Sequence, residues 1–271
     1  MSETRRRSLL SLQRRLATAT LPHGARLADD GTLVRQVNAP FVLLGALVLI
    51  GAATAPYPQV YWMVMASEQG VVENVTAFIA FYGAWVAVQL VRHAEELPHR
   101  WMAGWFGCFV VGLGFVGLEE ISWGQQWFFW ETPHWIGLVN TQGETNLHNL
   151  AKWSEEVPKL LLSLAAVVAG VLVPLWIAWR GPIALIHATP LRDIWPSASL
   201  WPSALIALVI RLIERVVANQ PGADSAAPLF RSLREGLEIF LVMFVVAYLL
   251  DMRLRHLGAP EQAPSSMRPT S

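Results

Sequence analysis

The chain has 271 residues, of which 54% are apolar and only 15% are charged, and its formal net charge is zero. So little charge argues against a soluble domain, and a zero net charge gives no electrostatic basis for a nucleic-acid partner. Cys108 is the single cysteine, which excludes an intramolecular disulfide and a site with several cysteine ligands to a metal. Several apolar runs approach the ~20 residues that a helix needs to cross a bilayer. These features predict an all-α, polytopic transmembrane helical bundle.

The N-terminal segment 1–38 is predicted to be a basic cytoplasmic arm. Leucines alternate with its arginines, so part of it could form an amphipathic helix on anionic lipid. A solvated tail that only sets the topology is an equally good interpretation. The bundle is predicted over 39–256, and the Pro/Ser-rich segment 257–271 is predicted to be a disordered tail.

About six spans are predicted from the apolar runs. Their ranges are 41–56, 73–92, 102–121, 157–179, 198–217 and 235–252. Arginines gather before the first span and at every second boundary after it, whereas the alternate loops 57–72 and 122–156 contain only Lys152 among Lys and Arg. The loop 218–234 departs from this pattern, because it contains Arg231 and Arg234. By the positive-inside rule, both termini are then cytoplasmic and the loop 122–156 faces outward. A multi-pass protein with this topology is expected in the cytoplasmic (inner) membrane if the source is bacterial. His93, His99, His187 and His256 fall at the predicted cytoplasmic ends, where we expect them to be interfacial or solvated.

The stretch from Gly117 to Asn149 holds the least usual residues of the chain. It begins with the adjacent carboxylates Glu119 and Glu120, continues through a Trp-rich segment, and ends with Glu144 and His148 four residues apart. If the helix continued past Glu120, Glu119, Ser122 and Gln126 would form a polar stripe on one face. The aromatic content of the loop predicts a helical or re-entrant piece packed at the outer interface.

Other charged residues lie at a similar depth, within the predicted spans or just before the sixth. They are Glu73, Arg211, Glu214, Arg215, Arg231, Arg234, Glu235 and Glu238. Charged groups in a span are costly, so they usually face the protein interior or water. Because the spans alternate in direction, all of these groups fall in the outer half. The pattern predicts a polar cavity open to the outside, with the Trp-rich loop as its roof.

Three chemical interpretations fit this set. Glu119, Glu120, Glu144 and His148 could bind a divalent metal, although adjacent helical residues diverge by ~100° and cannot both face one ion. Alternatively, a carboxylate in a partly desolvated cavity, with His148, could act as acid and base without a metal. In the third interpretation the arginines only neutralise the glutamates and so hold the helices together.

The motifs GLEEISWGQ and NTQGETNLHN, preceded by SEQGVVEN, resemble those of an uncharacterised group of bacterial multi-pass membrane proteins. The resemblance covers roughly 66 to 150. It implies a location in the bacterial inner membrane and a site shared by Glu73, Glu119, Glu120, Trp123, Gln125, Glu144, Asn146, His148 and Asn149. It implies no particular reaction.

The sequence therefore favours a membrane-embedded enzyme that acts on a lipid-linked or amphipathic substrate. The catalytic residues are predicted to be Glu119, Glu120, Glu144 and His148. Substrate-binding roles are predicted for Glu73, Trp123, Gln125, Asn146, Asn149, Arg211, Arg215, Glu214, Glu235 and Glu238. The expected partners are membrane lipids and a lipid-like substrate. The alternatives are an ion-coupled carrier and a structural subunit of a membrane complex.

Overall fold

The computed structural model describes residues 30–67, 70–128, 130–134, 152–180, 189–219 and 227–258. Within these ranges all regular secondary structure is helical, which confirms the all-α prediction. The long helices are α2 (Asp30–Thr54), α4 (Val71–Arg92), α5 (Trp101–Glu120), α11 (Trp201–Ala218) and α12 (Ala227–Leu257), together with one run made of α8 (Lys152–Val167), η5 (Val168–Leu172) and α9 (Val173–Arg180).

Short helices occupy the connections between the long ones. They are α3 (Pro58–Tyr61), η1 (Trp62–Ala66), η2 (Ala94–Glu96), η3 (Ser122–Gly124), α6 (Gln125–Phe128), η6 (Pro190–Asp193) and η7 (Ala198–Leu200). Each of the six predicted apolar ranges coincides with one of the long helical runs. The ends differ most at α2 and α12, which begin at Asp30 and Ala227 rather than at the predicted 41 and 235. The last residues of the predicted arm therefore belong to a helix.

In the part of the chain that the structure describes, three helices are long and apolar enough to cross a membrane. They are Pro58–Arg92, Trp101–Glu120 and Lys159–Arg180, and the apolar part of α2, Asn38–Thr54, is slightly shorter. Many large apolar side chains on these helices are exposed, among them Phe78, Val111 and Leu161. An outer surface that is apolar around the bundle is typical of helices that face lipid rather than water.

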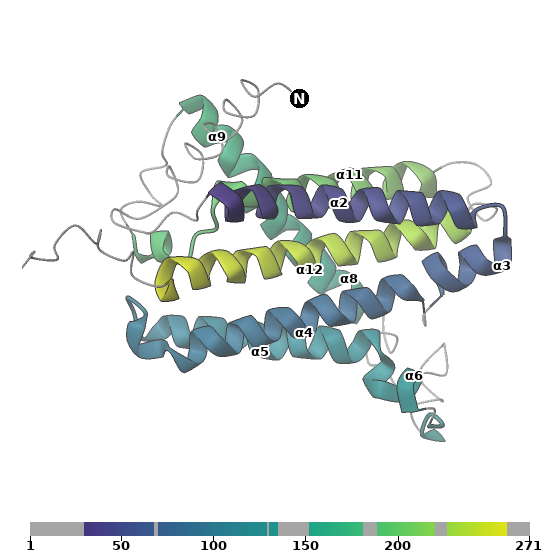
Figure 1. The fold of residues 1–271 in the computed structure, drawn as a ribbon, viewed down its shortest axis with the longest axis horizontal. Helices are drawn as coiled ribbons and strands as arrows, with labels where there is room; N and C mark the ends of the chain where they lie inside the picture. The colour runs from purple at the N-terminus through teal and green to yellow at the C-terminus, as the bar shows by residue number, and fades with distance from the viewer. Residues whose placement is uncertain are drawn as a thin grey trace, which may run out of the picture.

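Helix α12 is the centre of the bundle. It lies between the pair α2 and α11 and the pair α4 and α5, while the α8 to α9 run crosses behind it (Figure 1). Its buried side chains include Leu237, Phe240 and Leu249. Helices can approach closely here because Gly83 of α4 lies against Val246, so that an added Cβ would come within 2.6 Å of the valine Cγ2.

The helices alternate in direction, which gives the bundle two distinct ends. At the first, α5 ends and α4 and α12 begin; we call it the Glu120 end, and it lies on the right in Figure 1. At the other, α4 and α12 end and α5 begins; we call it the Arg92 end. Each end carries a group of buried polar side chains.

Candidate functional site

Carboxylates from three helices gather at the Glu120 end. Glu73 lies in the first turn of α4, Glu120 is the last residue of α5, and Glu235 and Glu238 are one turn apart on α12. The charges of the other three glutamates and of Lys159 act on Glu120, so each of these four groups lies within electrostatic range of it. We call these five residues the carboxylate cluster.

Lys159, the cation of the carboxylate cluster, pairs directly with Glu238. Lys159 Nζ donates a hydrogen bond to Glu238 Oε1, and the two side chains are 19% and 20% exposed. Arg231 and Arg234 also act on Glu235. Among the described residues, four carboxylates therefore share this end with the three basic groups Lys159, Arg231 and Arg234. The arrangement is suited to holding a proton or a cationic group.

Glu119 points to a different side of α5 from its neighbour. It is only 4% exposed, and it accepts a hydrogen bond from the indole Nε1 of Trp123. Consecutive helical residues diverge by about 100°, which explains why Glu119 binds Trp123 while Glu120 faces the carboxylate cluster. The sequence-based expectation that the two carboxylates cannot face one group agrees with this geometry.

The chain turns sharply after α5. Ser122 and Trp123 have φ values of 47° and 56°, and Gly124 follows with 93°. Left-handed backbone at a residue other than glycine costs of order 1–3 kcal/mol and needs support from its surroundings. The predicted stripe of Glu119, Ser122 and Gln126 is therefore wrong, because α5 ends before Ser122 and the residues do not share a helix face.

Two contacts hold the segment that follows this turn. Trp127 of α6 donates from Nε1 to Asn74 Oδ1 at 3.1 Å, and its ring stacks on Phe78 with centroids 5.9 Å apart. Gln125 Nε2 donates to Thr132 Oγ1 at 2.9 Å. Asn74 is the neighbour of Glu73, so α6 is attached next to the carboxylate cluster.

The predicted anion-binding residues of α11 are arranged along that helix. Arg211 Nη1 donates to Glu214 Oε2 at 2.7 Å, and Glu214 is only 6% exposed. Arg215 lies one turn further on and is exposed. Arg211 is therefore engaged with a carboxylate of its own helix, whereas the sequence analysis assigned it to a substrate anion.

The remaining predicted site residues, Glu144, Asn146, His148 and Asn149, lie outside the described residues. Within the described ranges, no group of three or more His, Cys, Asp or Glu side chains could hold a metal ion. The metal interpretation stays a prediction, because two of its four candidate ligands, Glu144 and His148, are not among the described residues.

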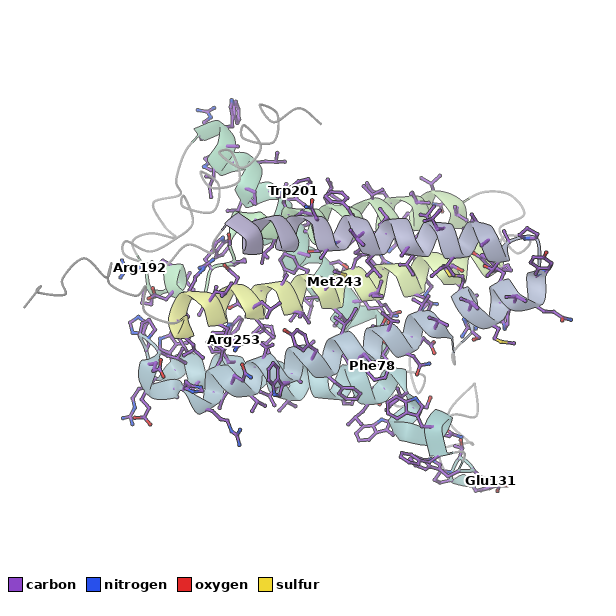
Figure 2. The ribbon with its side chains drawn as sticks, viewed as in Figure 1. Phe78, Glu131, Arg192, Trp201, Met243 and Arg253 are labelled. Atoms are coloured by element: carbon purple, nitrogen blue, oxygen red, sulfur yellow. The ribbon has the colours of Figure 1, made fainter. Side chains whose placement is uncertain are left out.

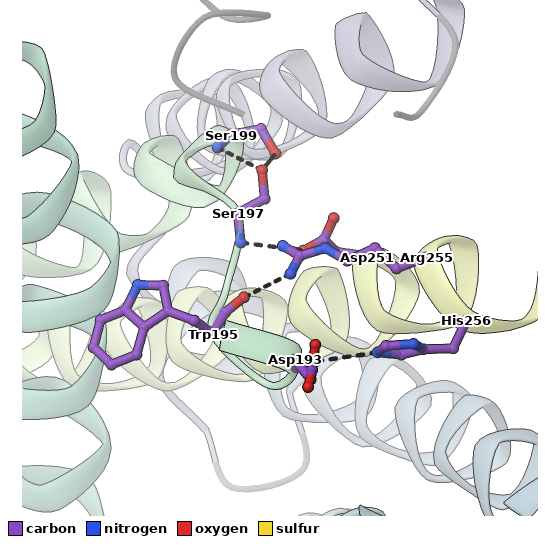
Figure 3. A network of polar contacts seen from close by, with 7 residues as sticks. All are labelled: Asp193, Trp195, Ser197, Ser199, Asp251, Arg255 and His256. Atoms are coloured by element: carbon purple, nitrogen blue, oxygen red, sulfur yellow. Dashed lines mark hydrogen bonds and ion pairs between the residues drawn. The ribbon is translucent and has the colours of Figure 1, made fainter. Parts of the chain in front are cut away.

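A second polar group occupies the Arg92 end (Figure 3). Arg255 of α12 donates from Nη1 to the carbonyl of Trp195 at 2.8 Å and from Nη2 to Asp251. The same carboxylate accepts the backbone N–H of Ser197 at 3.1 Å. Asp251 and Arg255 therefore attach the segment before α11 to the end of α12.

Two histidines meet at Asp193 in the same region. His99 Nε2 lies 3.1 Å from Asp193 Oδ2, and His256 Nε2 lies 3.1 Å from the Asp193 carbonyl. Burial lowers the pKa of His256 below its ordinary value. Both histidines lie at the Arg92 end, where they were expected to be interfacial or solvated, and each also contacts Asp193 of η6.

The sequence analysis missed Lys159 and the group around Asp251 and Arg255. Lys159 stands in the predicted span 157–179 and should have been recognised as a charge within an apolar run. Asp251 and Arg255 are four residues apart, the spacing of a helical ion pair, at the end of the most buried helix. No sequence pattern indicates the role of Asn74. Its partner Trp127 is brought to it by the turn at Ser122, Trp123 and Gly124, which the sequence did not predict.

Comparison of the chain with protein-family models, with curated proteins and with solved structures found no match. The interpretation of the site rests on its own residues.

Proposed function

We propose that the chain is a multi-pass protein of the bacterial inner membrane, with about six spans and both termini in the cytoplasm. Three helices with suitable length and hydropathy support a membrane location. The distribution of arginines supports the orientation, and the resemblance of the GLEEISWGQ and NTQGETNLHN motifs supports the bacterial inner membrane. The Glu120 end then faces outward.

We further propose that the carboxylate cluster is the acid/base site of an enzyme that acts on a lipid-linked or amphipathic substrate. The observation that supports this proposal is that four carboxylates from three helices lie at the same end of the bundle, with the other three within electrostatic range of Glu120. Glu120 is the principal acid or base, because Glu119 binds Trp123. Glu144 and His148, which are not among the described residues, are proposed as the second group on the sequence alone.

A purely structural role would favour carboxylates and cations in balanced pairs. Lys159 and Glu238 make one such pair, and Arg211 and Glu214 another. Glu120 lies within electrostatic range of three glutamates from two other helices as well as of Lys159, and a buried group of carboxylates of this kind is common at functional sites.

A carrier needs polar groups that continue across the membrane. Asp251 and Arg255 do place charge at the Arg92 end. Between them and Glu238, however, α12 has the sequence IFLVMFVVAYLL over 239–250, in which Tyr248 is the one polar residue. At about 1.5 Å per residue this is a barrier of roughly 18 Å. Figure 2 labels Met243 in the middle of this stretch.

The test is complementation of a deletion strain, scored by growth and by lipid profile. We expect Glu120→Gln to lower activity by about 10²–10⁴-fold while it inserts normally, and His148→Ala to act in the same direction. Glu95→Gln is the matched control, because Glu95 is exposed at the Arg92 end. Full complementation by normally inserted Glu119→Gln, Glu120→Gln and His148→Ala variants would refute the site.

Two further measurements separate the alternatives. Elemental analysis of the purified protein would reveal a stoichiometric divalent metal, and Glu120→Gln should then reduce its content. If the protein in proteoliposomes supports an ion flux, and the flux is lost in Glu120→Gln, the protein is a carrier rather than an enzyme.

A further inference from the structure

Four large aromatic side chains are exposed on the segment that follows α5. They are Trp123, Trp127, Phe128 and Trp130, and their exposed fractions lie between 39% and 72%. We call this surface the aromatic corner. Figure 1 shows α6 displaced from the Glu120 end toward the side of α5 that faces away from α12, and Figure 2 places Phe78 and Glu131 on either side of it.

The polar edges of two of these rings are turned inward. Trp123 donates its indole N–H to Glu119, and Trp127 donates its own to Asn74. An interfacial Trp commonly leaves this N–H for water or a head group. Here the N–H groups are satisfied within the protein, so the exposed part of each ring is carbon surface. Such a surface fits hydrocarbon better than a polar head group.

The position of the aromatic corner along the bundle also points to lipid. Helix α5 is one of the candidate membrane spans and ends at Glu120, two residues before the left-handed turn. A helix that continued straight would carry these rings into water. The turn at Ser122, Trp123 and Gly124 directs the chain sideways instead, and it is maintained although it is strained.

We propose that the aromatic corner inserts into the acyl-chain region of the leaflet at the Glu120 end. Its partner is the lipid bilayer itself, into which amphipathic segments bury an apolar face by about 5–10 Å. Phe128, at 72% the most exposed of the four, stacks on Trp130 with ring centroids 6.0 Å apart. The inference needs the membrane location but not the enzymatic role.

The test uses the fact that Cys108 is the single cysteine. In a Cys108→Ser background, Phe128→Cys carries a nitroxide, and the protein is reconstituted in liposomes. Collisional access is measured for oxygen, which concentrates in hydrocarbon, and for a nickel chelate, which stays in water. Val111→Cys, at a site 73% exposed on α5, is the lipid control, and Glu95→Cys is the water control.

We expect the label at Phe128 to be several-fold more accessible to oxygen than to the nickel chelate, as at Val111. If the label at Phe128 is accessible to the chelate, as at Glu95, while the label at Val111 remains exposed to lipid, the inference is overturned but the membrane location is not. A label shielded from both reagents also overturns it and indicates that protein covers the corner. Water access at both Phe128 and Val111 would refute the membrane location. Trp130→Cys repeats the measurement if Phe128→Cys fails to fold.

Discussion

Lys159 of α8 and Glu238 of α12 form a direct ion pair between helices whose residues are 79 positions apart in the chain. The pair is about one-fifth exposed. Its neighbours on α12 and α5, Glu235 and Glu120, are carboxylates. The two partners are therefore not equivalent: loss of the lysine leaves carboxylates without their nearest cation, whereas loss of Glu238 relieves repulsion.

The first prediction follows from this asymmetry. Lys159→Met should destabilise the fold by more than the about 1 kcal/mol of an exposed pair and by less than the about 3–5 kcal/mol of a fully buried one. Glu238→Gln should cost less, and the double variant should recover part of the loss. The measurement is the thermal midpoint in detergent, analysed as a double-mutant cycle. Equal losses in the two single variants would contradict the prediction.

A second prediction concerns the crossing of the α8 to α9 run with α11. A Cβ on Gly170 would overlap the Cβ of Ala204 and approach the ring of Phe244 to 2.9 Å. Gly170→Ala should destabilise the fold by about 1–3 kcal/mol, the usual cost of overpacking. Gly112→Ala is the matched control, because no atom lies within 4 Å of its added Cβ. The control should be neutral or more stable by up to about 1 kcal/mol, since alanine favours the helix.

The third prediction concerns the Arg92 end. The side chain of Arg255 is 1% exposed, so Asp251→Asn leaves a buried guanidinium without its counter-charge. We expect a loss of about 3–5 kcal/mol in unfolding free energy, and a partial recovery in the double variant with Arg255→Met. Arg192→Ala should change it by less than about 1 kcal/mol, because that side chain is 48% exposed beside Asp193. Denaturation followed by circular dichroism would measure these differences.

The fourth prediction is a pH dependence carried by His256. Burial lowers its pKa below the ordinary 6.5 in the folded protein, so the unfolded chain binds the proton more readily. The contribution to stability is complete above about 6.5 and is lost as the pH falls toward the folded-state pKa. Thermal midpoints at about pH 7.5 and about pH 5.5 should differ less in His256→Asn than in the natural chain. An unchanged difference would show that other groups carry the effect.

The approximate position of each long helix could be predicted, because a long apolar run in a membrane protein forms a helix that satisfies its backbone hydrogen bonds. The ends of the helices could not be predicted in this way. Helix α12 begins at Ala227 and includes Arg231 and Arg234. Because these residues are charged, the sequence analysis placed them before the span and began it at 235. Likewise, α2 extends back through Pro40 to Asp30.

Much of the carboxylate cluster was visible in the sequence, since Glu73, Glu120, Glu235 and Glu238 are charges within or beside apolar runs. The partners of these glutamates could not be predicted. The pairing of Lys159 with Glu238 depends on the angle at which α8 crosses α12, and that angle cannot be read from residue spacing within one helix. The same holds for Asp193 of η6, whose two histidine contacts come from the connection between α4 and α5 and from the last turn of α12.

The central place of α12 has a consequence for how the protein is made. The helices that carry Glu73, Glu119, Glu120 and Lys159 all precede α12 in the chain. Glu73, Glu120 and Lys159 are therefore synthesised before Glu235 and Glu238, which complete the carboxylate cluster. The tightly packed hairpin of α4 and α5 can assemble early, but both polar ends close only when α12 enters, so insertion of that helix is the step at which the bundle becomes committed to its final arrangement.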